Sequence, residues 1–297
     1  MANIVISVKN FYKAFGTKKV IEDLSFDVFE GEIFAFLGAN GSGKTTTIRT
    51  LLNIYKADKG ELTINGKVYD STMASYLGYL PEERGLYLTS RVLETLVYFG
   101  QLKGLSKSES TNNAQAYLAK VGLEDKEKSE LKKLSSGQQQ KIQLGITVIN
   151  NPKLLILDEP TKGLDPVNRE LLLSILMDLN NSGSTIIFST HQMEEVEKIA
   201  DRLLMIKDGK RALYGTLSEV KANYSDNSIK LSFEGSLPSE TELFTANINK
   251  NIATILLKPG IAQSDVIKYL ADKVKINRLE ENSPSLNDIF IKVMNSK

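Results

Sequence analysis

The hydrophobic positions along the chain form two kinds of pattern, and together they predict an α/β fold. Short continuous apolar runs occupy residues 33–37 and 154–157, and a third, with Ile186 to Phe188 at its centre, lies within residues 184–189. Runs of this length are typical of strands that are covered on both faces of a parallel sheet. Helical spacing of apolar residues instead marks three longer stretches, residues 91–103, 109–121 and 167–180. We therefore expect helices packed against a mainly parallel sheet.

The first 80 residues predict further strands. Polar and apolar residues alternate over residues 4–8 and 21–28, which indicates two strands ahead of the first buried run. The dipeptide Asn65-Gly66 predicts a tight hairpin turn between two alternating segments. Residues 76–80 then predict a short strand that Pro81 ends.

A glycine-rich loop joins the run at residues 33–37 to a helical pattern. Its sequence, GANGSGKT, follows the pattern G-x-x-x-x-G-K-[ST] in the strand-loop-helix context that phosphate binding requires. Backbone N–H groups of such a loop turn inward around a phosphate, and the following helix adds its positive N-terminus. Lys44 is expected to reach the β- and γ-phosphates, and Thr45 to offer its hydroxyl to Mg²⁺. The predicted ATP-binding residues are Gly38, Asn40, Gly41, Ser42, Gly43, Lys44, Thr45 and Thr46.

Two carboxylates follow the run at residues 154–157. Open α/β sheets bind ligands at the carboxyl ends of their strands, so Asp158 is predicted to hold Mg²⁺. Glu159 is predicted to orient or deprotonate the water that attacks the γ-phosphate. The alternative is that both carboxylates are simply exposed in a turn and have no function. The presence of the glycine loop in the same chain disfavours this alternative.

Three further residues have a functional and a structural interpretation. Phe15, upstream of the glycine loop, can stack on adenine or pack in a core. Ser135 can act simply as a helix N-cap. His191, the single histidine, ends a predicted strand, where it can be structural or contact the γ-phosphate.

Composition bounds the remaining functions. With 37 basic and 36 acidic side chains the net charge is +1, so composition gives no reason to expect a nucleic-acid partner. The chain has no cysteine, which excludes disulfides and thiolate metal sites and fits the cytoplasm. No apolar run approaches the ~20 residues that span a bilayer, and the N-terminus does not resemble a signal peptide. We therefore expect no membrane crossing by this chain.

Five motifs in a fixed order make the chain resemble the nucleotide-binding subunit of an ABC transporter over about residues 3–220. The glycine loop is similar to Walker A, LLILDEP to Walker B, LSSGQ to the signature loop, GLDP to the D-loop, and Ser189-Thr190-His191 to the switch histidine. The resemblance implies a P-loop NTPase fold. It assigns residues 1–220 to the ATP-binding domain and about 83–150 to an inserted helical subdomain.

The resemblance also implies roles for individual residues. Phe15 is similar to the aromatic residue that stacks on adenine, and His191 to the residue that contacts the γ-phosphate. The family works as a head-to-tail pair that sandwiches two ATP molecules. Ser135 and Gly137 are then expected to touch the γ-phosphate in trans, and Asp165 of the D-loop to belong to the same nucleotide site.

Two positions depart from the family pattern. Glu82 stands where the family usually has a glutamine, in the loop that senses Mg²⁺ and the membrane partner. As a carboxylate it can still bind Mg²⁺, and we include it among the expected catalytic and metal-binding residues. Its charge can also alter the proton affinity of Glu159. Ser136 replaces the first of two glycines in the signature loop, and we expect it to be tolerated.

Residues 221–297 are predicted to form a small α+β accessory domain. Strands are expected at residues 228–233 and 251–257, a helix at 261–274, and a strand followed by a helix in LEENSPSLNDIFIKVM. Together with Glu82, the S-L-x-D-I-F-I segment resembles the ATPase subunits of bacterial ABC-2 type exporters, among them drug-resistance and sodium-extrusion systems.

The resemblance implies an ATPase that powers a separate integral membrane permease, for export, as a homodimer or heterodimer of ATP-binding subunits. Such a subunit resides at the cytoplasmic face of the cell membrane. A soluble ABC-type ATPase acting on ribosomes or DNA is one alternative, although the chain has a single ATPase domain and no zinc cysteines. A nucleotide-gated binding module with negligible turnover, suggested by Glu82, is another.

Overall fold

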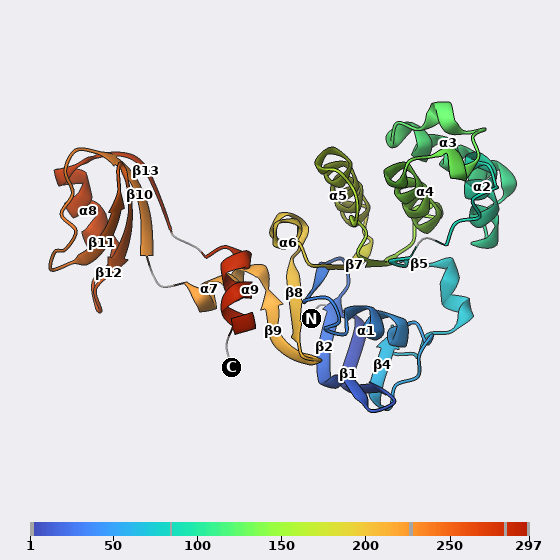
Figure 1. Ribbon diagram of the computed structural model, residues 1–297, viewed down its shortest axis with the longest axis horizontal. Helices are drawn as coiled ribbons and strands as arrows, with labels where there is room; N and C mark the ends of the chain where they lie inside the picture. Colours follow the sequence, from blue (N-terminus) through green and yellow to red (C-terminus); the bar gives the residue numbers. More distant parts are fainter. Residues whose placement is uncertain (1–2, 84, 226–227, 282–283, 296–297) are drawn as a thin grey trace. The chain divides into compact units, whose positions relative to one another are not determined.

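Figure 1 shows the computed structural model of the chain, which describes residues 3–83, 85–225, 228–281 and 284–295. The chain divides into two units, Met1–Leu217 and Ser218–Lys297. The domain boundary expected from the sequence was residue 220. Each unit has its own cluster of buried apolar side chains.

A six-stranded sheet forms the centre of the first unit. Its strand order is β5-β6-β7-β3-β8-β9, and every neighbouring pair is parallel except β8 and β9. All residues of β3, β6 and β7 are buried, which explains their continuous apolar runs. The α/β fold class is confirmed. The strands are β3 (Ile33–Leu37), β5 (Leu77–Leu80), β6 (Leu154–Asp158), β7 (Thr185–Thr190), β8 (Arg202–Lys207) and β9 (Lys210–Thr216).

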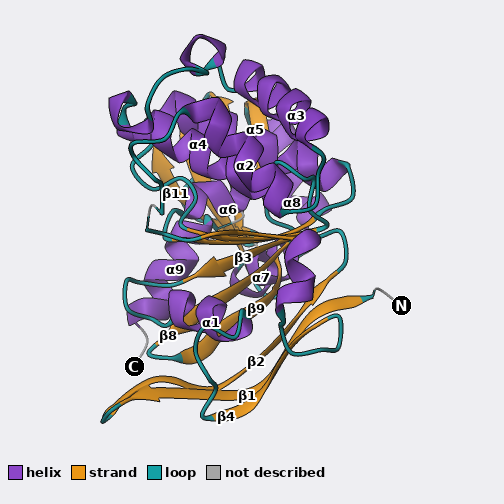
Figure 2. Cartoon of the chain, turned by 90° about the vertical axis from the view of Figure 1, so that its right-hand side faces the viewer, coloured by secondary structure: helices purple, strands orange, loops and turns teal. Residues whose placement is uncertain are grey.

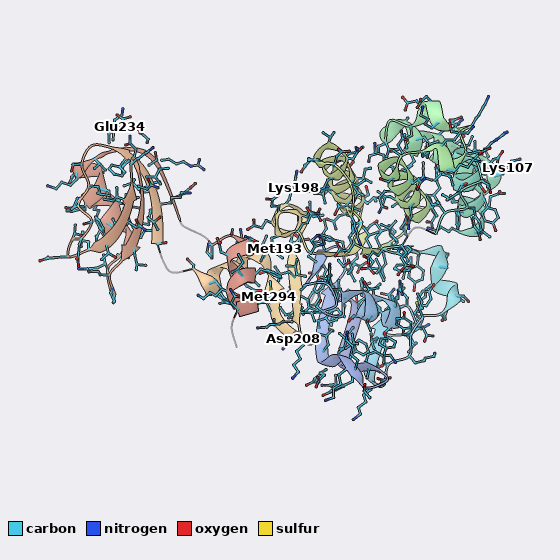
Figure 3. The ribbon with its side chains drawn as sticks, in the orientation of Figure 1. Lys107, Met193, Lys198, Asp208, Glu234 and Met294 are labelled. Carbon is cyan, nitrogen blue, oxygen red and sulfur yellow. The ribbon has the colours of Figure 1, made fainter. Side chains whose placement is uncertain are left out.

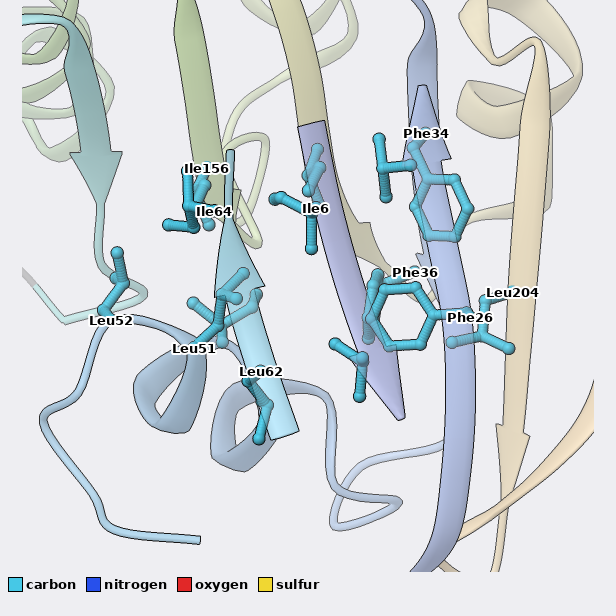
Figure 4. Close-up of a cluster of buried hydrophobic side chains, with 14 of the residues drawn as sticks. Ile6, Phe26, Phe34, Phe36, Leu51, Leu52, Leu62, Ile64, Ile156 and Leu204 are labelled. Atoms are coloured by element: carbon cyan, nitrogen blue, oxygen red, sulfur yellow. The ribbon is translucent and has the colours of Figure 1, made fainter. Parts of the chain in front are cut away.

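A second, antiparallel sheet of order β2-β1-β4 lies beside it. It contains β1 (Ile4–Phe15), β2 (Lys18–Phe29) and β4 (Lys59–Ile64). Phe26 of β2 stacks on Phe34 of β3, with ring centroids 5.7 Å apart, so the two sheets share one core (Figure 4). Helix α1 (Lys44–Leu51) buries Ile48 and Leu51 in the same core.

The hairpin predicted at Asn65-Gly66 is half right. Ile64 and Lys67 exchange two backbone hydrogen bonds across a tight turn. The segment after Gly66 is not a strand, however, and β4 pairs instead with β1. The alternation of polar and apolar residues after Gly66 therefore does not indicate a strand.

Helices cover the central sheet on both sides (Figure 2). One side carries α5 and the helices of the expected subdomain, whereas α1 lies on the other side with the antiparallel sheet. Helix α6 joins α5 through the ion pair of Lys198 with Glu170 and buries Met193 at its start (Figure 3). The helices are α2 (Val92–Leu102), α3 (Lys107–Lys120), α4 (Ser136–Val148), α5 (Pro166–Asn181) and α6 (Met193–Ile199), with 3-10 turns at Ser71–Ser75, Glu124–Lys126 and Leu131–Lys133.

The second unit is an α+β module. Its antiparallel sheet has the order β11-β12-β10-β13, and α8 packs its apolar residues against it. Every strand and helix predicted in this region is present, whereas β11 and α7 were not predicted. The linker residues Asn282 and Ser283 lie outside the described residues. The elements are α7 (Leu217–Tyr224), β10 (Ser228–Glu234), β11 (Phe244–Asn249), β12 (Ile252–Leu257), α8 (Gln263–Lys273), β13 (Lys275–Glu281) and α9 (Leu286–Asn295).

Among the described residues, no helix is both long enough and apolar enough to cross a bilayer.

Candidate nucleotide site

The glycine loop lies between the buried strand β3 and helix α1, as the motif predicts. Gly43 precedes the helix with a φ of 110°, and a Cβ there would lie 2.3 Å from the Ile21 side chain, so the position requires glycine. Lys44 is buried, and its ammonium donates to the Gly38 carbonyl at 2.8 Å. The loop therefore places a cation and the positive end of a helix at one point, which is an anion site.

A cavity of about 550 Å³ opens above this loop. A volume of this order suits a small-molecule ligand. The cavity brings together predicted residues that are more than 140 positions apart in the sequence, from Phe15 to Glu159. Its lining residues include Phe15, Asn40, Gly41, Gly43, Lys44, Thr45, Thr46, Glu82 and Glu159.

Asp158 and Glu159 are organised by Ser189 of the neighbouring strand β7. The fully buried Ser189 hydroxyl donates to Asp158 Oδ1 at 2.6 Å and accepts the Glu159 N–H at 2.9 Å. Glu159 itself has a φ of 52°, a left-handed conformation that is strained for a residue with a side chain. The sheet thus holds the two carboxylates in fixed and different directions.

The Glu159 carboxylate lies between two cationic or basic groups. Its Oε1 is 3.7 Å from the Lys44 ammonium and its Oε2 is 3.0 Å from His191 Nδ1. Burial raises the pKa of Glu159, while Lys44 and His191 act in the opposite direction. A buried carboxylate with a raised pKa, at the edge of a cavity, is suited to accept a proton.

His191 directly follows β7, whose last residue is fixed by contacts to two helices. The preceding residue, Thr190, donates its hydroxyl to Glu195 Oε2 at 2.8 Å, and both side chains are buried. The second Glu195 oxygen faces Arg169 of α5 at 3.5 Å. The His191 side chain is half exposed, so it can reach a ligand while it contacts Glu159.

The residues around Asp158 fit a divalent cation. Asp158 is completely buried, yet its Oδ2 has no hydrogen-bond partner among the described residues. The Thr45 hydroxyl is near enough to lower the pKa of Asp158, which burial raises overall. Among the described residues, no group of three or more histidine, aspartate or glutamate side chains is placed to hold a metal ion by itself. This fits Mg²⁺, which usually takes only one or two ligands from the protein and completes its coordination with phosphate oxygens and water.

Phe15 faces the cavity instead of packing in a core. Its side chain is 45% exposed, and its ring makes an edge contact with Tyr55 at 5.3 Å between centroids. Asp58 braces the same strand end, because its carboxylate accepts the Ala14 N–H at 2.6 Å and the Lys13 ammonium at 2.8 Å. The arrangement suits the stacking of a base on Phe15.

The residues expected to act in trans, and Asp165 of the D-loop, are not among those that line this cavity. Ser135 caps α4 and accepts the Gln138 N–H, and Asp165 caps α5 and accepts the Asn168 N–H. Gly137 lies in the first turn of α4. The N-cap interpretation of Ser135 is therefore correct, and the structure adds an N-cap at Asp165. Any contact of these residues with a nucleotide remains a prediction that requires a second copy.

Sequence reasoning missed three residues around the site. Ser189 was noted only as part of a motif. Lys162 forms an ion pair with Glu82, with 2.6 Å between Nζ and Oε1. Gln143 of α4 donates to the backbone carbonyls on either side of Glu82, those of Pro81 and Glu83. No local sequence signal connects these partners. Arg84 in the same loop lies outside the described residues.

Models of two protein families match the chain. One, described as ABC transporter, covers residues 21–162, and the other, described as ATP-binding protein DrrA1-3-like, C-terminal domain, covers residues 215–294.

Several known proteins are similar to the chain over most of its length. The ABC transporter ATP-binding protein YhaQ of Bacillus subtilis is 36% identical over 97% of both chains. The Nod factor export ATP-binding protein I of Rhizobium sp. is 31% identical over 99% of this chain and 98% of its own. The linearmycin resistance ATP-binding protein LnrL of Bacillus subtilis is 34% identical over 78% of this chain and 76% of its own.

The solved structures agree on the fold. An ATP-binding subunit of an ABC transporter superposes with a TM-score of 0.69 at 29% identity, covering 74% of this chain and 93% of that one.

Proposed function

Because this chain belongs to the ABC transporter family of ATP-binding proteins, we propose that its cavity binds ATP with Mg²⁺ and that the hydrolysis powers a separate membrane permease. The chain is an ABC-type ATPase and a subunit of a transporter complex with membrane components. The observation that carries the site assignment is the contact of Glu159 with both Lys44 and His191 at the edge of the cavity.

The geometry supports a direct attack of water on the γ-phosphorus. The loop N–H groups and Lys44 bind the phosphates, and Phe15 stacks on the base. Glu159 takes a proton from water as the new P–O bond forms, while the bond to the β-phosphate breaks and ADP leaves with its electron pair. His191 keeps Glu159 directed at the water. Mg²⁺, when held by Asp158 and Thr45, would neutralise charge on the phosphate oxygens.

Export is the proposed direction of transport. Two of the similar proteins are named for Nod factor export and for linearmycin resistance, which supports an export role. The match of residues 215–294 to a DrrA-like C-terminal domain supports the same subclass.

An exposed apolar patch is the proposed contact surface for the permease. It follows the Glu82 loop directly and continues onto α2, where Tyr98 is 54% exposed. Apolar patches with a polar rim are typical of protein interfaces. Its occupant would be a cytoplasmic helix of the membrane subunit, since the resemblance assigns partner sensing to the adjoining loop. Tyr87 and Tyr98 line one hollow together, and the exposed apolar residues next to them along the chain are Leu88 and Leu102.

Phosphate release from Mg²⁺-ATP tests the catalytic assignment. The parent protein is expected to turn over, and Lys44→Ala to lose ATP binding because the phosphate contact is missing. Tyr98→Ala, which is remote from the cavity, should keep basal turnover but lose association with the membrane subunit. Equal turnover by the parent and Lys44→Ala would contradict the site. Undiminished association of Tyr98→Ala would contradict the contact surface.

A further inference from the structure

Glu82 and Lys162 form an ion pair at the rim of the nucleotide cavity. They come from the loops after β5 and after β6, 80 positions apart, and their charged atoms lie 2.6 Å from each other. Glu82 lines the cavity, and its side chain is one-third exposed. Lys162 is more exposed, at 60%, and is not among the residues that line the cavity.

The two loops are fixed independently of this pair. Gln143 of α4 donates to the carbonyls of Pro81 at 3.3 Å and Glu83 at 3.2 Å. From the same helix, Gln140 donates to the carbonyl of Pro160 at 2.9 Å. Because these bonds hold the backbone, removal of the Lys162 ammonium should change the freedom and charge of the Glu82 carboxylate more than the course of the loop.

Charge makes the pair significant for a phosphate ligand. Glu82 adds a third carboxylate to Asp158 and Glu159, and its charge contributes to the raised pKa of Asp158. The pKa of Lys162 is raised, first by its hydrogen bond to Glu82 and further by Glu159 and Asp158. An unpaired carboxylate at this rim would repel the triphosphate, whereas a paired one is close to neutral.

We propose that Lys162 is a positioning residue for nucleotide binding, whose ammonium neutralises Glu82 and holds its carboxylate at the cavity rim. The pair then does what a neutral amide at position 82 would do. This inference rests on the assignment of the cavity to ATP.

Equilibrium titration with a fluorescent ATP analogue in excess chelator tests the pair without any contribution from metal or turnover. Lys162→Met keeps the apolar stem but leaves Glu82 unpaired, so the Kd should rise by about 3- to 10-fold at low salt. Glu82→Gln should bind at least as tightly as the parent. In the double variant Glu82→Gln/Lys162→Met the Kd should return to within about 2-fold of the parent.

Lys18→Met is the matched control, because Lys18 also lines the cavity but pairs with neither partner. Lys18→Met should raise the Kd because it removes one positive charge from the cavity. It should raise the Kd by the same factor in the parent and in the Glu82→Gln variant. Parent-like binding by Lys162→Met would overturn the inference. The inference would also be overturned if the double variant Glu82→Gln/Lys162→Met bound as weakly as Lys162→Met. The same holds if Glu82→Gln restored the Kd of Lys18→Met as fully as that of Lys162→Met. If the parent does not bind ATP, the site assignment itself fails, and the inference with it.

Discussion

Removing the Ser189 hydroxyl should damage both stability and catalysis. The hydroxyl makes a 2.6 Å hydrogen bond to the Asp158 carboxylate, and neither side chain is exposed to solvent. A hydrogen bond to a charged group contributes about 1.5–3 kcal/mol. The Glu159 N–H also loses its hydrogen bond to this hydroxyl, but it still donates to the Ser189 carbonyl at 3.2 Å. This second loss therefore adds little to the change in the free energy of unfolding. In a domain of this size about 1 kcal/mol shifts Tm by 2–4 °C, so Ser189→Ala should lower Tm by about 3–12 °C.

The same substitution should slow ATP hydrolysis by about 10- to 100-fold, because groups that orient metal ligands typically have effects of that size. Thermal unfolding by circular dichroism and a phosphate-release assay measure the two effects. Ser184→Ala is the matched control, since its buried hydroxyl donates to the neutral Pro152 carbonyl at 2.8 Å, ahead of the same strand. It should cost about 0.5–1.5 kcal/mol and leave turnover unchanged. If the two variants behave alike, Ser189 has no special role.

Two further substitutions probe the carboxylates. Burial raises the folded-state pKa of Asp158 above its unfolded value, so stability is lost as pH rises from the unfolded pKa through the folded one. Asp158→Asn should therefore raise the Tm of the ligand-free protein by a few degrees at pH 7 and by less at pH 4, and an unchanged or lower Tm at pH 7 would contradict this. Asp58→Asn should weaken the hold on the strand end at Phe15 and raise the Kd for ATP by about 2- to 5-fold in a fluorescence titration, because the pairing with Lys13 is lost. Unaltered affinity would show that Asp58 does not support the base platform.

Strands and helices could be predicted from the sequence where their pattern of hydrophobic residues follows directly from how they are buried. Strands β3, β6 and β7 are covered on both faces, and their apolar runs have no other simple explanation. Strand β11 was missed because its sequence, FTANIN, contains two asparagines and no buried residue after Phe244. After Gly66 the sequence predicted a strand that the structure does not have. A tight turn does not require that both of the segments it joins belong to a sheet.

The site was predictable where the chemistry is local. The phosphate loop places Lys44 and Thr45 side by side in sequence and in space, and Asp158 and Glu159 are adjacent. The contacts that organise these residues join distant positions, as Ser189 is 31 positions from Asp158 and Lys162 is 80 from Glu82. Such pairs depend on strand order and loop packing, which no short motif specifies. The strained φ of Glu159 is equally a product of the fold.

The most direct test of the account is the association state of Glu159→Gln in the presence of ATP and Mg²⁺. The substitution keeps the side chain's size but removes its basicity, so turnover should fall by about 10²- to 10⁴-fold and the ATP-bound dimer should accumulate. Size-exclusion chromatography with light scattering should show this dimer, and addition of Ser135→Arg should abolish it while monomers still bind ATP. A Glu159→Gln/Ser135→Arg protein that dimerises as well as Glu159→Gln would contradict the shared site.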